Sequence, residues 1–231
     1  MDRCRIAAVI PAFNEELTVG QVVATVKAAG FFDEIIVVSD GSTDGTAAAA
    51  RAAGATLVHE LPAKRGKGAA LGHGVMHTDA AIVCFFDADL RGLTTEHVGL
   101  ILEPVLRGRR HMNVGLRDRG PFWTALAARL PLVGGERALR REIFDLIPQK
   151  FLRGFKVESA LNYFCRANGL PYGFAVLPGL SIRRKMQKVG LGRGLVEYIR
   201  MWLQVAAAMI EVRLAWRQFR EMGGHMSHHH R

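Results

Sequence analysis

The stretch AIVCFFDADL, residues 81–90, contains an apolar run of strand length that is followed at once by Asp87 and Asp89. Two carboxylates at positions i and i+2 of an extended backbone point to the same side. Their oxygens are ligands that Mg²⁺ and Mn²⁺ prefer, and such a site usually completes its coordination with substrate phosphates and water. A pair of solvated aspartates in a loop or helix cap is the structural alternative. The position directly after a strand favours a metal site.

Comparable apolar runs occur on both sides of this stretch and alternate with segments of helix-forming composition. The expected strands are residues 5–10, 34–39, 55–60, 81–86 and 111–116. The expected helices between them are residues 17–29, 43–53, 68–77 and 94–106. This order is typical of βαβ units, whose right-handed crossovers place helices on both faces of a sheet. The sequence therefore predicts an α/β fold with a mostly parallel, twisted sheet flanked by helices.

The rest of the chain is less regular. We expect a helix at residues 155–168, a strand at 172–177 and an amphipathic helix at about 195–221. The expected organisation is one domain over residues 1–190, with parts at 1–117 and 118–190, then the amphipathic segment 191–222 and a flexible tail at 223–231.

Composition narrows the class of protein. Of the 231 residues, 49% are hydrophobic and 23% are charged, which is typical of a globular chain and excludes a disordered one. The longest uncharged stretch, 167–182, is broken by glycines and prolines, and the N-terminus lacks the pattern of a secretory signal. We therefore expect a cytoplasmic protein. The three cysteines have no CxxC spacing, which indicates reduced thiols.

The formal net charge of +10 indicates an anionic partner. Most of it lies in residues 180–231, where ten Lys or Arg stand against three Glu. A nucleic-acid-binding protein is one reading of this charge. The sequence lacks the aromatic residues interleaved with basic ones that form a base-stacking surface, so we expect no nucleic acid. A dinucleotide oxidoreductase is excluded because no GxGxxG follows the first strand.

Polar residues follow the other expected strands as well. The segment PAFNEE, residues 11–16, follows the first strand, and Asp40 opens the turn DGSTDG after the second. Ligands of open α/β sheets bind beyond the carboxyl ends of the strands, so these groups should meet Asp87 and Asp89 at one edge. Asp40 could accept a hydrogen bond from a nucleotide base, and its turn could also cap the next helix. Lys67, in the turn RGKG, could meet a phosphate or be a solvated basic group.

Together these segments resemble the successive motifs of glycosyltransferase family 2, whose members are nucleotide-sugar-dependent enzymes of the GT-A fold. The segments are VIPAFNEELTVGQVV, EIIVVSDGSTDGTA, RGKGAALGHG and FFDADL, in the correct order over residues 5–117. The resemblance implies a hexosyltransferase with Mg²⁺ or Mn²⁺, a nucleotide-sugar part at 1–117 and an acceptor part at 118–190. It implies that Asp87 and Asp89 hold the metal and that Asp89 takes part in catalysis. The residues expected to bind the nucleotide are Pro11, Ala12, Asn14, Glu15, Asp40, Lys67, Asp87 and Ala88.

Two further resemblances give two expectations for the acceptor. DADL resembles the polyprenyl-phosphate (dolichyl-phosphate-like) hexosyltransferases, which implies transfer from a UDP-sugar, favoured over a GDP-sugar, to a lipid-linked phosphate. VIPAFNEE and GKGAAL resemble glucosyl-phosphoglycerate synthases, which implies a small soluble anion such as phosphoglycerate. Arg91 stands where the polyprenyl-phosphate enzymes commonly carry Gln, and we expect it to touch phosphate. The lipid acceptor is the main expectation and phosphoglycerate is the alternative.

Later residues supply candidates for acceptor binding and proton transfer. Arg117 and Arg119 follow the fifth strand and Arg137 lies in GGERALRRE, so each could bind the acceptor or the diphosphate, or be a surface arginine. Glu158 begins a late helix, where similar transferases place an acidic residue. It could be a general base, position the sugar, or stabilise the helix N-terminus. The histidines without ligand spacing to the aspartates are expected to be structural: His59, His73, His77, His97 and His111.

The expected C-terminal helix bears on the acceptor. It has a wide apolar face, and basic residues at 183–188 precede it. This layout predicts a helix that lies in a bilayer interface, at the inner face of the membrane, and brings the site to a lipid-linked acceptor. Packing of the apolar face on the domain, or on a second subunit of a homodimer, is the alternative.

Overall fold

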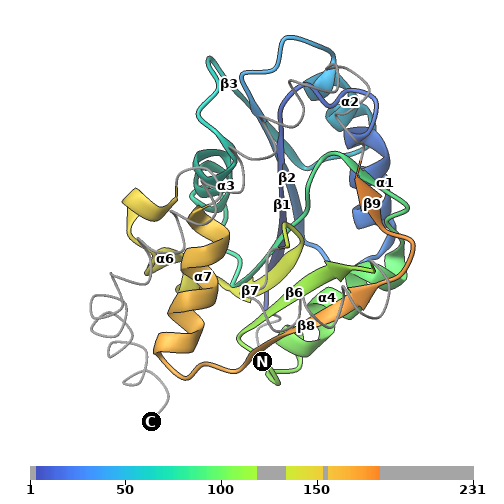
Figure 1. The fold of residues 1–231 in the computed structure, drawn as a ribbon. Helices are drawn as coiled ribbons and strands as arrows, with labels where there is room; N and C mark the ends of the chain where they lie inside the picture. Colours follow the sequence, from blue (N-terminus) through green and yellow to red (C-terminus); the bar gives the residue numbers. More distant parts are fainter. Residues whose placement is uncertain (1–3, 119–133, 153–155, 183–231) are drawn as a thin grey trace, which may run out of the picture.

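A computed structural model describes residues 4–118, 134–152 and 156–182. Its ribbon shows one central sheet with helices on both faces (Figure 1). The strands are β1 Ile6–Ala12, β2 Glu34–Asp40, β3 Leu57–Leu61, β4 Ile82–Phe85, β5 Leu90–Arg91, β6 Met112–Arg117, β7 Arg137–Arg140, β8 Tyr172–Leu177 and β9 Ser181–Ile182. The helices are α1 Val19–Ala28, α2 Thr46–Ala52, α3 Lys67–Val75, α4 Thr95–Leu106, α6 Arg141–Asp145, the 3-10 helix η1 Gln149–Phe151 and α7 Lys156–Ala167.

The main sheet has seven strands in the order β3-β2-β1-β4-β7-β6-β8. The pairs β1–β2, β1–β4, β2–β3 and β6–β8 are parallel, whereas β7 is antiparallel to both β4 and β6. A separate two-stranded sheet joins β5 to β9. The expectation of a mostly parallel sheet is confirmed. Its parallel strands β1, β2 and β4 end at the same edge, so the segments that follow them meet there.

The core lies on both faces of this sheet. Successive residues of a strand point to opposite faces, so Ala8 and Ile10 of β1 pack in the layer of α1 and α4, while Val9 packs in the layer of α3, α6 and α7. In Figure 1 α3, α6 and α7 lie on one side of the sheet and α1, α2 and α4 on the other. Each fully buried Val or Ile contributes roughly 1.5–3 kcal/mol. This two-sided burial explains why β1, β2 and β4 are nearly continuous apolar runs.

The expected elements up to residue 117 are present, with ends displaced by one to three residues. The expected helix at 155–168 is α7 and the expected strand at 172–177 is β8. The sequence did not reveal β7, which lies in GGERALRRE between two parallel strands. The C-terminal amphipathic helix, the tail and Arg119 lie outside the described residues. Within the described part of the chain, no helix combines the length and the hydropathy that crossing a bilayer requires.

Candidate functional site

Hydrogen bonds join the loop after β1 to the loop after β2. The backbone N–H of Asn14 donates to Ser42 Oγ at 3.1 Å, and the N–H of Thr43 donates to Asn14 Oδ1 at 2.9 Å. Asn14 has a φ of 55°, in the left-handed region that Asn tolerates better than most residues. The N–H of Glu15 donates to Thr46 Oγ1 at 2.8 Å. Pro11 and Ala12 complete β1 just before this junction, so the first predicted nucleotide segment is held in a fixed conformation.

Asp40, the last residue of β2, organises the loop that leads into α3. Its side chain is buried, and its two oxygens accept the backbone N–H groups of Arg65 and Gly66, both at 2.7 Å. The next residue, Gly41, has a φ of +70°, and a Cβ there would come within 2.5 Å of Lys64 N. The turn therefore requires glycine. The carboxylate of Asp40 fixes the approach to Lys67, while its contact with a nucleotide base stays a prediction.

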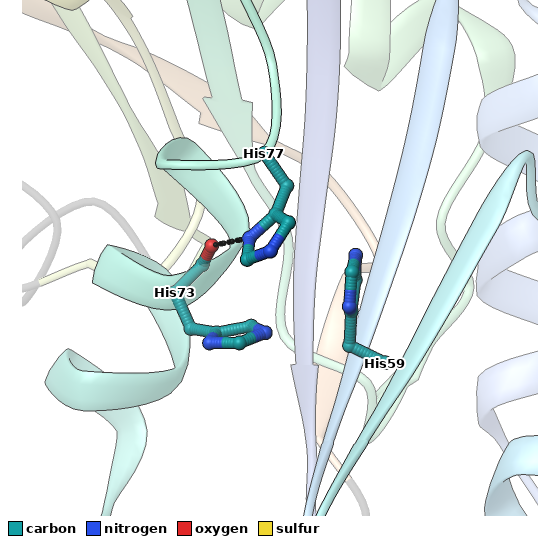
Figure 2. Close-up of side chains that lie close together, drawn as sticks. All are labelled: His59, His73 and His77. Carbon is teal, nitrogen blue, oxygen red and sulfur yellow. Dashed lines mark hydrogen bonds between the residues drawn. The ribbon is translucent and has the colours of Figure 1, made fainter.

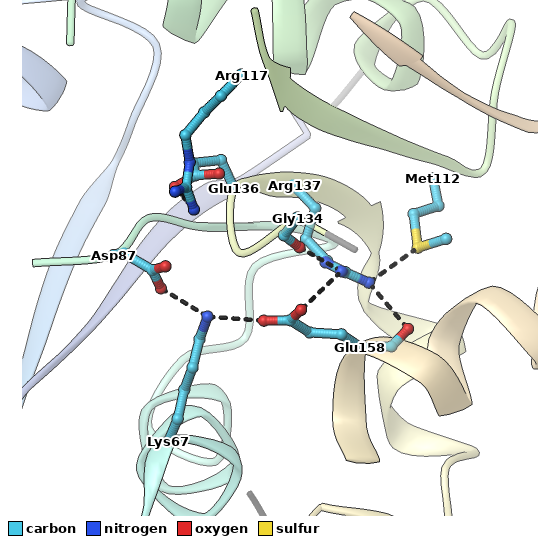
Figure 3. A network of polar contacts seen from close by, with 8 residues as sticks. All are labelled: Lys67, Asp87, Met112, Arg117, Gly134, Glu136, Arg137 and Glu158. Carbon is cyan, nitrogen blue, oxygen red and sulfur yellow. Dashed lines mark hydrogen bonds and ion pairs between the residues drawn. The ribbon is translucent and has the colours of Figure 1, made fainter. Parts of the chain in front are cut away.

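Lys67 is the first residue of α3 and connects two carboxylates from distant parts of the chain (Figure 3). Its Nζ lies 2.6 Å from Asp87 Oδ1 and 2.8 Å from Glu158 Oε1. Burial alone would lower the pKa of Lys67, but the carboxylates of Asp87 and Glu158 outweigh it and raise the pKa above its usual value. Lys67 is therefore a cation. In this structure it contacts the first aspartate of the predicted metal pair.

Glu158 lies in the first turn of α7 between two cations. Besides Lys67, it faces Arg137, whose Nη2 lies 4.0 Å from Glu158 Oε2 and whose Nη1 donates to the Glu158 carbonyl oxygen at 3.4 Å. Nη2 of Arg137 also donates to the Gly134 carbonyl oxygen. Arg137 is only 1% exposed. Its guanidinium therefore lies inside the fold against Glu158, and the expected contact of Arg137 with an acceptor or a diphosphate stays a prediction.

Glu136 is a member of this cluster that the sequence reasoning missed. Its side chain is fully buried, and neither carboxylate oxygen has a hydrogen-bond partner among the described residues. Burial, and next the negative charge of Asp87, raise the pKa of Glu136 to about 7, although Arg117 and Lys67 oppose the shift. Arg117 Nη2 lies 3.9 Å from Glu136 Oε1. The only sequence signal was an acidic residue beside Arg137 in an unassigned segment.

The glycine pair before Glu136 allows this close packing. A Cβ on Gly135 would lie 2.3 Å from Asp87 Oδ2 and 2.7 Å from Lys67 Nζ. A Cβ on Gly134 would lie 2.6 Å from the Gly115 carbonyl oxygen. The loop that leads into β7 therefore passes directly over Asp87, and only glycine leaves room for the carboxylate and the ammonium.

The other predicted residues of the DADL segment lie close by in the chain. Ala88 is buried and Asp89 is half-buried in the turn between β4 and β5. Arg91 lies on β5, where its side chain is exposed and its backbone pairs with Ser181 of β9. The predicted phosphate contact of Arg91 stays a prediction. Of these residues Asp87 contacts Lys67, which in turn contacts Glu158.

The cluster in Figure 3 joins carboxylates and cations in one network. Asp87, Glu136 and Glu158 are balanced by three cations, and Asp89 adds a fourth carboxylate in the adjoining turn. All the anionic donors are oxygens, which suit Mg²⁺ or Mn²⁺. The carboxylate of Glu136, buried beside Asp87, lies 3.9 Å from Arg117 Nη2 and accepts no hydrogen bond among the described residues. The residues that could hold the ion are Asp87 and Asp89.

Comparison with known proteins identifies relatives of this arrangement. The glycosyl transferase family 2 sequence model matches residues 7–156. The glucosyl-3-phosphoglycerate synthase of Mycolicibacterium smegmatis is 36% identical over 190 residues, which cover 68% of this chain and 62% of that protein. The enzyme of the same name from Mycobacterium tuberculosis is 33% identical over 193 residues, covering 68% of this chain and 59% of the relative.

Solved structures of the M. tuberculosis enzyme share the fold. One, a complex with Mn²⁺, UDP and glucosyl-3-phosphoglycerate, superposes with a TM-score of 0.74 at 28% identity, covering 90% of this chain and 79% of that one. Another, with Mg²⁺ and UDP, gives the same TM-score, identity and coverage. The prediction of the GT-A fold is thereby confirmed.

These relatives carry the name of the alternative acceptor, phosphoglycerate, and not that of the polyprenyl-phosphate enzymes. The chain spans about 60% of the length of these curated relatives, so their activity is not transferred to it by similarity alone. The match of the family sequence model over well more than half of the chain shows membership at the level of the family. The chain belongs to glycosyltransferase family 2.

Proposed function

We propose that this protein transfers a hexosyl group, glucosyl in the simplest case, from a UDP-sugar to a small anionic acceptor such as phosphoglycerate, with Mg²⁺ or Mn²⁺. The observation that carries the proposal is the oxygen-rich cluster of Asp87, Lys67 and Glu158 at the carboxyl edge of the sheet. The names of the relatives support the phosphoglycerate acceptor over the lipid acceptor that the sequence favoured. The positive net charge fits an acceptor of this kind.

The residues have distinct parts in this proposal. Asp87 and Asp89 hold the ion, which when bound would neutralise charge developing on the departing diphosphate. Lys67 is a cation next to the same carboxylate and would contact the phosphates of the donor. Arg117, whose side chain is 19% exposed, would contact the acceptor anion.

Glu158 is better suited to position the sugar than to remove a proton. Its Oε1 accepts from Lys67 and its Oε2 faces Arg137, so both oxygens already lie against cations. Arg137, held by the Gly134 carbonyl oxygen, fixes the orientation of Glu158. We therefore propose Arg137 as a positioning residue and Glu158 as a group that binds hydroxyl groups of the donor sugar.

The test is the metal-dependent release of UDP from UDP-glucose with a panel of acceptors. The panel consists of 3-phosphoglycerate, glycerol 3-phosphate and polyprenyl phosphate in detergent micelles. We expect turnover with 3-phosphoglycerate that requires Mn²⁺ or Mg²⁺ and is abolished by Asp89→Ala. Asp79→Ala is the matched control, because Asp79 has a side chain 94% exposed outside the cluster.

Turnover only with polyprenyl phosphate would restore the lipid acceptor and overturn the proposed one. Absence of metal-dependent turnover with every UDP-sugar and acceptor, in a protein shown to be folded by circular dichroism, would contradict the activity itself.

A further inference from the structure

Three histidines meet at the far end of α3 from Lys67. His59 lies on β3, the edge strand of the sheet, His73 lies in the last turn of α3, and His77 lies in the turn that ends this helix. One ring nitrogen of each lies within 4.8 Å of those of the other two. The ring centroids are 4.2 to 4.9 Å apart (Figure 2). The fold thus brings together a strand residue and two helix residues spaced i and i+4.

The free nitrogens of this cluster point to a ligand. Within the described residues, His59 Nε2 and His73 Nε2 are buried and have no hydrogen-bond partner. A buried polar atom without a partner is unfavourable, and most such atoms in proteins are satisfied. A lone pair on each of these nitrogens would be satisfied by a metal ion.

The ring of His77 is held by a hydrogen bond in an orientation that suits metal binding. His77 Nδ1 lies 2.7 Å from the His73 carbonyl oxygen, as Figure 2 shows. A carbonyl oxygen only accepts, so Nδ1 carries a proton and donates it, and Nε2 is the nitrogen that would bind a metal through its lone pair. Such a bond from the other ring nitrogen to a carbonyl is the usual outer-shell support of a metal-binding histidine.

The surroundings also favour neutral rings. Burial, and next the charge of His77, lower the pKa of His59; burial and then His77 and His59 lower that of His73. A stack of three structural histidines is the alternative and was the expectation from sequence. It gives no account of the two unpartnered Nε2 atoms.

We propose that His59, His73 and His77 form a Zn²⁺ site with three imidazole ligands and a water in the fourth position. Zn–N bonds of about 2.0–2.1 Å in a tetrahedron place the nitrogens about 3.3 Å apart, so small side-chain rotations from the present separations suffice. His77 is exposed, which leaves the fourth position open to solvent. The ion would tie the edge strand β3 to α3, the helix whose first residue is Lys67. The site is independent of the proposed sugar transfer.

The site differs in chemistry from the carboxylate cluster, and this allows a selective test. Imidazole nitrogens suit Zn²⁺, whereas carboxylates suit Mg²⁺ and Mn²⁺. Zn²⁺ is titrated into the full-length chain against a chromophoric chelator, with Mg²⁺ in excess to occupy the carboxylates. Because histidines at the C-terminus also bind Zn²⁺, the titration uses a chain in which four tail residues are replaced by Ser: His225, His228, His229 and His230.

We expect one Zn²⁺ per chain, and a roughly 10- to 100-fold loss of affinity in His77→Ala, which changes an exposed side chain and so leaves the fold intact. The double variant His59→Gln and His73→Gln should lose the site. His111→Gln and Asp89→Ala are the controls and should bind Zn²⁺ as the parent does. Co²⁺ in place of Zn²⁺ should give the intense visible absorption of a four-coordinate ion in the parent and lose it in His77→Ala.

Equal Zn²⁺ affinity in the parent and His77→Ala, loss of the site in Asp89→Ala, or the weak absorption of six-coordinate Co²⁺ would each overturn the proposal.

Discussion

The two ends of α3 hold two polar clusters of opposite character, roughly 13 Å apart along a helix of nine residues. At the N-terminus, Lys67 is a cation between carboxylates. At the C-terminus, three rings with few hydrogen bonds face one another. A cation in the first turn is disfavoured by the helix dipole, so Asp87 and Glu158 must more than compensate. One helix thus presents charge-paired carboxylates at one end and imidazole nitrogens at the other.

Removing Asp87, at the N-terminal end of α3, should have the largest effect on activity. Asp87→Ala deletes one of the two proposed metal ligands and the nearest partner of Lys67. We expect the metal-dependent rate of UDP release to fall roughly 10³-fold, since a metal ion supplies several kcal/mol of charge stabilisation. Steady-state kinetics over a range of Mn²⁺ concentrations measures this loss.

Zn²⁺ binding in the same Asp87→Ala protein is the control, and it should be unchanged. If Asp87→Ala weakened Zn²⁺ binding as strongly as it weakened Mn²⁺-dependent turnover, the two ends of α3 would not hold separate ion sites.

Glu136 should make the free energy of unfolding depend on pH. Its pKa is raised from 4.5 to about 7, so in the unfolded chain it loses its proton at lower pH than in the folded protein. The free energy of unfolding should therefore fall as the pH rises from about 4.5 to about 7 and be flat in this respect above that range. The shift corresponds to about 3 kcal/mol. Glu136→Gln keeps the shape and abolishes this contribution.

The measurement is urea unfolding at pH 5 and pH 8 in EDTA, with wild type and Glu136→Gln compared at each pH. The variant should gain about 3 kcal/mol on wild type between the two conditions. Glu96→Gln, which changes an exposed carboxylate on α4, should gain nothing. If the free energy of unfolding changed equally with pH in wild type and Glu136→Gln, Glu136 would be ionised throughout this range. The raised pKa of Glu136 would then be contradicted.

Sequence reasoning succeeded where local patterns determine the structure. The run before Asp87 is apolar because β4 is buried on both faces, and this signal fixed the strand and the position of the carboxylates. Up to Arg117 the strands and helices, except the two-residue strand β5, follow the same βαβ logic. The residues from Gly134 onward do not, because β7 enters the sheet antiparallel between β4 and β6. Its place depends on pairing with distant strands, which no local pattern reveals.

The same distinction applies to the two clusters. Asp87 and Lys67 were recognised from short motifs, but their contact, and the burial of Glu136 beside them, depend on a loop 50 residues later in the chain. His73 and His77 have visible helical spacing, whereas His59 joins them only because β3 is packed beside α3. The spacing of residues in the sequence does not predict contacts between residues of separate helices and strands.

The smallest expected effects are changes in the free energy of unfolding when Lys67 or His73 is replaced. These two substitutions compare the two ends of α3 directly. In the absence of metal, Lys67→Met removes the cation that Asp87 and Glu158 share, while Arg137 stays beside Glu158, and we expect a loss of about 2 kcal/mol in the free energy of unfolding. His73→Gln removes a ring whose Nε2 has no hydrogen-bond partner among the described residues, so its cost should be within about 0.5 kcal/mol.

Urea unfolding in EDTA at pH 7 measures both, with the exposed Lys27→Met as control. Adding Mn²⁺ should restore part of the stability that Lys67→Met loses, and Zn²⁺ should stabilise wild type but not His73→Gln. Equal costs for Lys67→Met and His73→Gln in EDTA would contradict the contrast, because charge pairing at one end of α3 and neutral rings at the other predict unequal ones.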